Sequence, residues 1–448
     1  MNKGFLFDLN KCVGCHACVV ACQIENGKDQ HQPWREISTY NSYQHPKLPV
    51  FHYSLACNHC EDAPCMESCP ALAYTKDEGL NTIVHHADRC IGCKYCTWAC
   101  PYDAPKYVNS KGVVEKCTLC TNRLNEGLKP ACANLCPTGA LDFKEIELKE
   151  QSRIAGFTEI GVNPQIKIIQ LRKKSQPKNQ AQISPKEEKL FNQLQLNLPS
   201  KISLEKEWVL VPFTILVALL TAFLSSAALG FLEINPWLFM AAGGFALVLS
   251  SIHLGKKIKA WRSILNIKNS WLSREILSYG LFMILSVIWF LIPNYIYLGM
   301  AGSLAGFLCA FSVDKVYKVA KKTTRFELHS ASVFLTALLF FSLLTNNERF
   351  IIIILVLKTL LYLYRKIYFI IHGKLLRIVL TIARIGFGFI VPVVWWNHLQ
   401  LGIWEPVMLS VLIGEVFDRV EFYLELEIVS PKIQIKDDLA AKVQLIKS

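Results

Sequence analysis

The sequence lacks an export signal. Its first residues, Met1 to Asp8, contain no long apolar core, no twin arginine and no cleavage site, and a cysteine-rich stretch begins at Cys12. A secretory signal peptide would need the apolar core and the cleavage site. We therefore expect a chain that is not exported, and a framework of disulfide bonds, which is typical of small secreted domains, becomes a poor explanation of the cysteines.

Cysteine and histidine are both scarce in the second half. Sixteen of the 17 cysteines lie before residue 137, which leaves only Cys309, and we expect Cys309 to be a small buried residue. The histidines after residue 200 are His253, His329, His372 and His398. A di-haem anchor needs pairs of histidines that face each other across helices. These four do not form such pairs at mid-depth, so we expect no haem.

The sixteen early cysteines form four quartets. The first and third have the spacing C-x2-C-x2-C-x3-C, the second has a looser version, and the fourth has a loop between its second and third cysteines. Three quartets end in Cys-Pro. The quartets are Cys12, Cys15, Cys18 and Cys22; Cys57, Cys60, Cys65 and Cys69; Cys90, Cys93, Cys96 and Cys100; and Cys117, Cys120, Cys132 and Cys136.

This spacing is typical of [4Fe–4S] ligands. In such a run the first three thiolates bind one cubane and the fourth ligates the other cluster of a pair. Zinc ribbons use paired C-x2-C units instead of triplets followed by x3-C. Every quartet is complete, so the nearby His16, His59, His85 and His86 are not needed as ligands. We expect four [4Fe–4S] clusters held by the sixteen cysteines.

Residues 1–144 are predicted to form the cluster domain. Short strands are expected at Phe5-Leu6-Phe7 and at Asn81-Thr82-Ile83-Val84, as in α+β ferredoxin-like folds. The domain has few long apolar runs, so the clusters must replace much of its core, and removing iron should unfold it. Residues 145–205 are charged and are predicted to be a linker.

The rest of the chain is predicted to be an all-α membrane domain over residues 206–425, followed by a polar tail over 426–448. Hydrophobic residues make up 52% of the chain, and they gather in its second half. Each of eight apolar segments approaches the length that crosses a bilayer. The segments are 208–230, 236–254, 275–292, 296–313, 329–345, 350–370, 377–396 and 403–420.

The basic residues predict an orientation. The net charge is +13, which suits nucleic acid or a membrane surface. The lysines and arginines lie in short loops on one side of the expected helices, whereas the opposite loops hold only Arg349. The membrane interpretation is therefore favoured, with no nucleic acid. The positive-inside rule places the termini and the cluster domain on the cytoplasmic side of a bacterial inner membrane.

Two stretches of the first half carry a family resemblance. Cys57-Asn-His-Cys-Glu-Asp62 and Cys90-Ile-Gly-Cys-Lys-Tyr-Cys96, with the four quartets, resemble the iron–sulfur subunit of dimethyl sulfoxide reductase-type molybdoenzymes over about residues 3–144. His253-Leu-Gly255, Ser270-Trp-Leu-Ser-Arg-Glu-Ile276 and Gly414-Glu-Val-Phe-Asp-Arg419 resemble their membrane anchor over about 205–425. The chain thus looks like a fusion of two subunits that are usually made separately.

The resemblance implies an electron conduit without substrate chemistry of its own. The anchor would oxidise menaquinol from the quinone pool, and four clusters would pass electrons to a separate molybdopterin subunit. It also implies that quartets one and four share one ferredoxin half, and that quartets two and three share the other. The histidine matching His253 is implicated at the quinol site. Several relatives face the periplasm, and the absence of an export signal here departs from that pattern. The terminal substrate stays open.

Ionisable residues inside the apolar segments are the other candidates for a quinol site. They are His253, Glu275, Arg384 and Glu415. Quinol oxidation releases two protons, and His253 has the ordinary pKa that suits a base. A structural ion pair between Arg384 and Glu415 is the alternative, and Lys358 has no obvious partner. Two further hypotheses are reverse flow, from a dehydrogenase into quinone, and a redox-linked ion pump.

Overall fold

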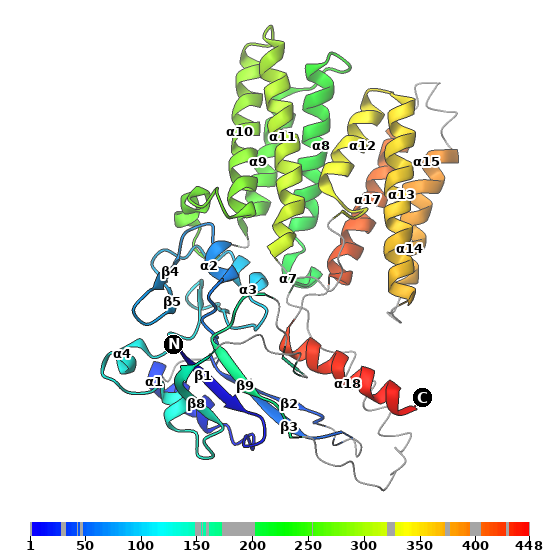
Figure 1. Cartoon of the computed structure of the whole chain (residues 1–448). Coiled ribbons are helices and arrows are strands. Elements are labelled where there is room, and N and C mark those ends of the chain that lie inside the picture. The colour runs from blue at the N-terminus through cyan, green and yellow to red at the C-terminus, as the bar shows by residue number, and fades with distance from the viewer. Residues whose placement is uncertain are drawn as a thin grey trace. The chain divides into compact units, whose positions relative to one another are not determined.

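The computed structural model describes residues 2–27, 33–42, 44, 48–147, 154, 156–157, 161–172, 202–252, 254–319, 328–371, 377–394, 405–426 and 430–447. The chain divides into two compact units (Figure 1). The first, here called the cluster unit, comprises Met1–Lys201 and Ile428–Ser448, and the second, the helical unit, comprises Ile202–Glu427. His253 and residues 173–200 of the expected linker lie outside the described residues.

A three-stranded sheet organises the cluster unit. Its central strand β1 (Asn2–Asp8) pairs antiparallel with β8 (Leu141–Ile146) and parallel with β9 (Ile166–Ile169). Both strands expected from the sequence, at residues 5–7 and 81–84, are confirmed by β1 and β5. The remaining strands form three hairpins: β2 (Glu36–Tyr40) with β3 (Phe51–Leu55), β4 (Tyr74–Asp77) with β5 (Thr82–His85), and β6 (Lys106–Val108) with β7 (Val113–Glu115).

Strand β9 lies in the stretch that we expected to be a charged linker. Its residues alternate, so that Ile166 and Ile168 are buried while Lys167 and Ile169 are exposed. Alternation with period two is the pattern of a half-buried strand. Only four residues carry this pattern, and the surrounding charge obscures it in the sequence.

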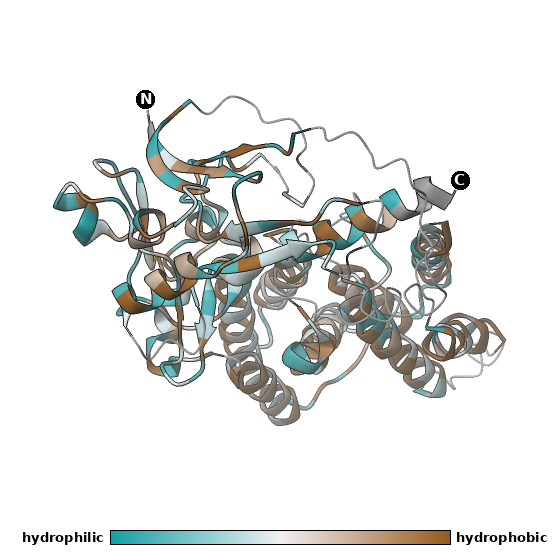
Figure 2. Cartoon of the chain, turned by 90° about the horizontal axis from the view of Figure 1, so that it is seen from below, coloured by the Kyte–Doolittle hydropathy of each residue, from teal (hydrophilic) through white to brown (hydrophobic). Residues whose placement is uncertain are grey.

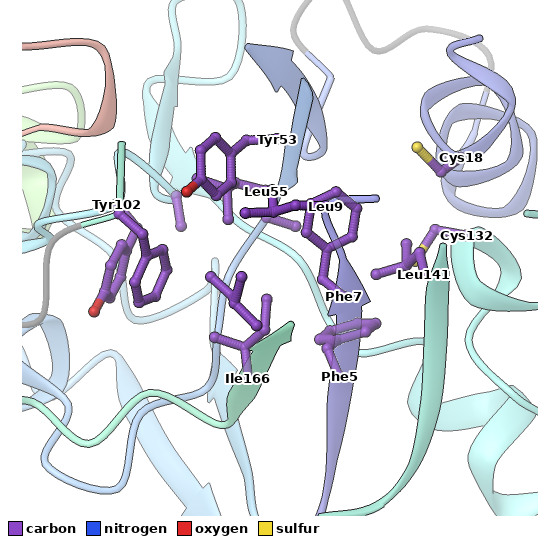
Figure 3. Close-up of a cluster of buried hydrophobic side chains, with 14 of the residues drawn as sticks. Phe5, Phe7, Leu9, Cys18, Tyr53, Leu55, Tyr102, Cys132, Leu141 and Ile166 are labelled. Atoms are coloured by element: carbon purple, nitrogen blue, oxygen red, sulfur yellow. The ribbon is translucent and has the colours of Figure 1, made fainter. Parts of the chain in front are cut away.

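The core of the cluster unit combines aromatic side chains with cysteines. Phe5 and Phe7 of β1 pack against Tyr53 of β3 and Leu141 of β8 (Figure 3). Cys18 and Cys132 belong to the same buried cluster. The helices around it are short: α1 (Ala17–Asn26), α2 (Pro64–Glu67), α3 (Tyr95–Ala99), α4 (Thr121–Asn125) and α5 (Ala131–Asn134).

The C-terminal helix α18 (Pro431–Lys447) also belongs to the cluster unit. We expected a polar tail here. Ile435 and Leu439 of α18 are buried in the core, and the Asp438 carboxylate accepts a hydrogen bond of 2.8 Å from the Gly156 N–H. Lys432 pairs with Glu36 of β2 at 3.2 Å. The two apolar residues are four apart, so they share one face of the helix.

Helices make up the described part of the helical unit. Each of the eight apolar segments expected from the sequence contains a helix or a continuous helical run. These are α8 (Leu210–Ala228), α9 (Pro236–Ile252), α10 (Trp271–Leu291), α11 (Ile296–Val316), α12 (Val333–Leu344), α13 (Glu348–Ile371), α14 (Ile378–Ile385) extended by the π-helical η3 (Gly386–Ile390) and α15 (Val391–Val394), and α17 (Glu405–Glu425). Shorter helices are α7 (Leu204–Glu207), η1 (Lys257–Ile264) and η2 (Tyr317–Val319).

The helical unit has the surface of a membrane protein. Among the described residues, three helices are long and apolar enough to cross a bilayer, or four if α9 and η1 form one bent span. Only 22% of the most apolar stretch of α10 is buried inside the unit. Side chains such as Ile284 and Leu291 face outward, and the helices are coloured as hydrophobic over most of their length (Figure 2). A soluble protein rarely exposes so large an apolar surface. The count of eight spans stays a prediction.

Candidate metal centres and buried charges

The cysteines regroup in space into four sets that differ from the four sequence quartets. Cys12 interacts electrostatically with Cys15, Cys18 and Cys136. Cys22 interacts instead with Cys132 and Cys120, and Cys117 interacts with Cys57 of the second quartet and with Cys22 and Cys132. The first set is therefore Cys12, Cys15, Cys18 and Cys136, and the second is Cys22, Cys117, Cys120 and Cys132.

The other two quartets exchange their fourth cysteine in the same way. Cys60 and Cys65 interact with Cys57 and Cys100, which gives the third set. Cys93 and Cys96 interact with Cys69 and Cys90, which gives the fourth. Cys69, Cys90, Cys93 and Cys96 also line one small cavity. The exchange agrees with the pairing of quartets that the family resemblance implies.

The loop at the start of each quartet has the same backbone. The residue before the second cysteine has a positive φ in all four: 70° at Gly14, 43° at His59, 70° at Gly92 and 60° at Leu119. Glycine adopts this left-handed conformation at little cost, whereas histidine and leucine do so rarely. The backbone N–H groups of Gly92 and Leu119 point to the first sulfur of their loops, at 3.4 Å from Cys90 and 3.3 Å from Cys117.

These sets fit iron–sulfur clusters better than other groups. All seventeen cysteines are free thiols. Among the described residues, no group of three or more Cys, His, Asp and Glu side chains is arranged to hold a single metal ion. Buried donors beside the cysteines, including Asn58 Nδ2 and His59 Nε2, lack a hydrogen-bond partner in the described part of the chain. Cluster sulfides and thiolates are acceptors that would satisfy such donors.

Burial controls the protonation of the free thiols. It raises the pKa of Cys22 to about 12 and raises those of Cys65, Cys93 and Cys117 further. Only the thiolate binds metal, so metal binding must release these protons. Burial also lowers the pKa of His59 well below its ordinary value, and the charge of Lys116 adds to this. His59 is thus neutral, and its Nδ1 accepts a hydrogen bond from the Ile83 N–H at 3.2 Å.

Glu275 occupies a buried position in the first turns of α10. It is 7% exposed. The Cys309 thiol of α11 approaches its main-chain oxygen at 3.8 Å. Arg419 of α17 interacts with it electrostatically. A carboxylate within an apolar helix is costly to bury, so its retention favours a function. His253, its expected neighbour in the quinol site, lies outside the described residues.

Arg384 and Glu415 form an ion pair between two helices, which is the structural alternative to a role in the quinol site. Arg384 Nη2 of α14 lies 2.9 Å from Glu415 Oε1 of α17. Lys358 of α13, for which the sequence offered no partner, lies 2.9 Å from Glu415 Oε2. The Thr336 hydroxyl of α12 donates to the same oxygen at 2.6 Å. Glu415 is therefore held by three helices and is far more constrained than Glu275.

The ion pairs continue along α17 as a charge ladder. We use this name for the carboxylates Glu415, Asp418, Glu421 and Glu425 of α17 and for the cations Lys358, Arg365 and Lys366 of α13 and Arg384 of α14. Arg365 lies 2.8 Å from Asp418 and 3.3 Å from Glu421, and Lys366 lies 3.0 Å from Glu421. Four negative and four positive groups balance, which is the condition for burying charge in a membrane protein.

Glycines and a π-helical turn make room for Arg384. A methyl group on Gly388, within η3, would lie 2.1 Å from Arg384 Nη1, and one on Gly414 would lie 2.5 Å from the Gly388 Cα. No other residue fits at either position without moving the guanidinium. The π-helical turn at 386–390 thus accompanies the buried charge, as such turns often do at specialised sites.

Comparison with known proteins covers both units. Residues 49–146 match the model of a 4Fe-4S dicluster domain, and residues 208–373 match that of the DMSO reductase anchor subunit (DmsC). One chain of the anaerobic dimethyl sulfoxide reductase of Escherichia coli is 40% identical over 152 residues, which is 32% of this chain and 74% of that protein. The chain belongs to the family of dimethyl sulfoxide reductase iron–sulfur subunits.

Other relatives of this iron–sulfur subunit carry the names of different enzymes. A protein of Halobacterium salinarum, named as a dimethyl sulfoxide reductase iron–sulfur subunit, is 35% identical over 177 residues, covering 33% of this chain and 67% of that protein. A sulfite dehydrogenase subunit of Allochromatium vinosum is 34% identical over 162 residues, covering 32% and 68%. With the anchor match, the chain is an iron–sulfur subunit fused to its membrane anchor, and it is a membrane protein.

Sequence reasoning missed several buried charges of this fused subunit. Of the charge ladder, the sequence indicated only Arg384 and Glu415 as a possible pair and Lys358 as a residue without an obvious partner. The spacing of Glu415, Asp418 and Glu425 places these carboxylates near one face of a helix, and Lys358 and Arg365 share a face of another. This periodicity was the available signal. Arg35 and Lys116, both buried in the cluster unit, carried no such pattern.

Proposed function

We propose that the chain carries electrons from menaquinol to a separate molybdopterin-containing reductase. The observation that carries this proposal is that sixteen cysteines in four spatial sets and the sequence of a DMSO reductase anchor subunit occur in one chain. Bound [4Fe–4S] clusters, one in each set, would supply the one-electron carriers. The chain itself would bind no terminal substrate.

The cysteine sets serve this function through their shared backbone. Each ferredoxin half contributes a pair of sets that exchange one cysteine, so the two sites of a pair lie on the same short helices. Cys18 and Cys22, for example, are four residues apart in α1 but belong to different sets. This arrangement holds two carriers at a fixed short separation.

Glu275 and His253 are the proposed quinol site. Quinol oxidation releases two protons for every two electrons, so the site needs a group that accepts protons. Glu275 suits this role because it is a buried carboxylate that does not belong to the charge ladder. Glu415 is less suitable, since Lys358, Arg384 and Thr336 already bind its two oxygens. We assign Arg384 and Glu415 a supporting role that holds α13, α14 and α17 together.

The same proposal predicts the location of the chain and its partner. The helical unit would sit in the lipid of a bacterial inner membrane, and the basic loops would hold the cluster unit on the cytoplasmic side. The partner would be a molybdopterin subunit, because the relatives are named as chains of dimethyl sulfoxide reductase or of other oxidoreductases. A reporter fused after Ser448 should be active in the cytoplasm, and activity in the periplasm would overturn the orientation.

The deciding experiment is electron paramagnetic resonance of the anaerobically purified protein, before and after a menaquinol analogue is added. Quinol should reduce the clusters in the unchanged chain. Reduction should be at least about tenfold slower in His253→Ala and in Glu275→Gln, because proton acceptance is impaired. Dithionite should reduce all variants equally. Glu405→Gln, at the exposed start of α17, is the matched control and should behave like the unchanged chain.

Reverse flow is the second candidate. It is favoured by the similarity to a subunit named as part of a sulfite dehydrogenase. If only dithionite reduces the clusters and added quinone empties them, a dehydrogenase feeds the chain. An ion pump is less well supported, because Glu415, Asp418, Glu421 and Glu425 are each within 3.3 Å of a lysine or arginine and are not free to cycle.

A further inference from the structure

A buried arginine lies near cysteines of the first and second sets. Arg35 precedes β2 and is 1% exposed. Its Nη1 donates to the Ser54 main-chain oxygen at 2.9 Å and to the Ser54 hydroxyl at 3.1 Å. The guanidinium lies over the Phe5 ring, 4.9 Å from its centroid. Its Nε has no hydrogen-bond partner in the described part of the chain.

This guanidinium has no carboxylate to balance its charge among the described residues. The groups that interact with it electrostatically are Cys132, Cys18, Cys117 and Cys22. A free thiol is neutral in its protonated form and supplies no counter-charge, whereas a cysteine bound to iron is an anionic thiolate. A buried charge without a counterion is strongly unfavourable. Iron-bound thiolates in these two sets are the anions that the site fits.

Ser54 links Arg35 to one ligand directly. The Ser54 oxygen accepts the hydrogen bond from Arg35, so its hydroxyl hydrogen is free to donate elsewhere. Cys18 Sγ lies 3.1 Å from that oxygen. A metal-bound thiolate can only accept a hydrogen bond. The direction of both hydrogen bonds is therefore fixed: Arg35 donates to Ser54, and Ser54 donates to Cys18.

We propose that Arg35 is a positioning residue that raises the reduction potential of the clusters held by the first and second cysteine sets. It acts through its own charge on both sets and through Ser54 on Cys18. Reduction adds an electron, and a nearby buried positive charge stabilises the reduced form. Hydrogen bonds donated to the sulfurs stabilise the reduced form in the same manner. The inference rests on the proposed function, since it requires that these sets hold clusters.

Arg123 provides a contrast within the same half. It also acts on a cysteine of the second set, Cys120, but it is partly exposed and pairs with Glu25 at 3.3 Å. Solvent and its carboxylate partner screen its charge. Arg35 has neither, so its effect on a neighbouring cluster is much larger.

The test is a redox titration of the full chain, followed by electron paramagnetic resonance, with iron and sulfide counted in every sample. Arg35→Gln should reduce the equilibrium constant for reduction at least tenfold at one or two clusters, which is about 59 mV or more for a one-electron couple. Arg35→Lys keeps the positive charge, so the reduction potentials of both clusters should stay close to those of the unchanged chain. Ser54→Ala should lower the potential of one cluster by less. Arg123→Gln is the matched control and should change little.

The outcomes separate this inference from the proposed function. Fewer than four clusters in the unchanged chain would count against the proposed function. Four clusters with unchanged potentials in Arg35→Gln would overturn the role of Arg35. If Arg35→Gln fails to assemble clusters, Ser54→Ala is the deciding variant. A lowered potential at one cluster supports the hydrogen bonds that run from Arg35 through Ser54 to Cys18. Unchanged potentials at all four clusters reject the proposal.

Discussion

The two units use opposite means to bury polar groups. The cluster unit buries eleven of its sixteen quartet thiols, a guanidinium and several donors that lack a partner in the described part of the chain, so its interior is complete only with the groups its cysteines hold. The helical unit buries six of the eight charged side chains of the ladder, and the eight pair with one another. The first fold therefore depends on a cofactor, whereas the second supplies its own counterions. This difference predicts different responses to iron removal and to loss of a single charge.

Iron removal should have the largest effect, and it should be confined to the cluster unit. Chelation under reducing conditions should unfold that unit, because metal binding is part of its folding free energy. The helical unit should keep its helices. Limited proteolysis and circular dichroism in detergent would follow the two separately. Survival of a protease-resistant cluster unit without iron would show that the apolar core around Phe5 and Tyr53 is sufficient by itself.

The matched control for iron removal is Cys309→Ala. Cys309 is fully buried in α11 and is the one cysteine outside the quartets. Its replacement should leave iron content unchanged, whereas Cys65→Ala should lower it, because Cys65 belongs to the third set. Equal iron loss in the two variants would contradict the assignment of the ligands.

Breaking the charge ladder should have the next largest effect. Lys358→Met removes one partner of Glu415 in the buried interior of the helical unit, where both side chains are at most 1% exposed. Loss of one member of a buried ion pair typically costs about 3–5 kcal/mol. The thermal unfolding temperature in detergent should fall clearly, while iron content stays unchanged. Lys257→Met, on the exposed face of η1, is the control.

A second substitution would sharpen this result. Lys358→Met combined with Glu415→Gln removes both charges of the pair and should recover part of the lost stability. Arg384 would then keep Asp418 at 3.2 Å as its partner. If the double variant is less stable than the sum of the single variants predicts, the pair is not an independent unit within the ladder.

The same contrast explains what could be predicted from the sequence. The cysteine spacing is local, so the candidate ligands could be proposed from one stretch, and the apolar segments were located by their length. Lys358 and Glu415 are 57 residues apart in the chain, and nothing local connects them. The positions of β9 and α18 in the cluster unit are likewise set by tertiary contacts. Arg35 looked like any surface arginine, because its burial depends on strands that pair across the domain.

The C-terminal helix should contribute a moderate part of the stability of the cluster unit. Ile435→Ala removes a buried side chain from the face of α18 that packs on the core. The expected cost is about 2 kcal/mol, at the lower end of the range for such substitutions because the residue lies at the edge of the core. Urea unfolding of the cluster unit, followed by the visible absorbance of the clusters, would measure it. Asp437→Ala, at an exposed position of α18, is the control, and equal effects would argue against docking of this face.

The smallest expected effect is a pH dependence of the contact between α18 and β2. Burial raises the pKa of the Glu36 carboxyl, but the hydrogen bonds and charges of Lys106 at 2.7 Å and Lys432 at 3.2 Å outweigh burial and hold that pKa below 4.5. The unfolded chain therefore binds the proton first as the pH falls. The contribution of Glu36 is fully present above about pH 4.5 and is lost as the pH falls through the folded-state pKa.

The size of this contribution is below about 1 kcal/mol, because the pairs are partly exposed. Thermal unfolding of the unchanged chain and of Glu36→Gln should differ at about pH 7 and converge as the pH falls through the folded-state pKa of Glu36, below 4.5. Acid also attacks the clusters, but it does so in both proteins, so the difference between them isolates Glu36. Lys432→Ala should remove part of the same difference and leave the share that comes from Lys106. A difference that persists in acid would mean that Glu36 stabilises the unit through packing instead of charge.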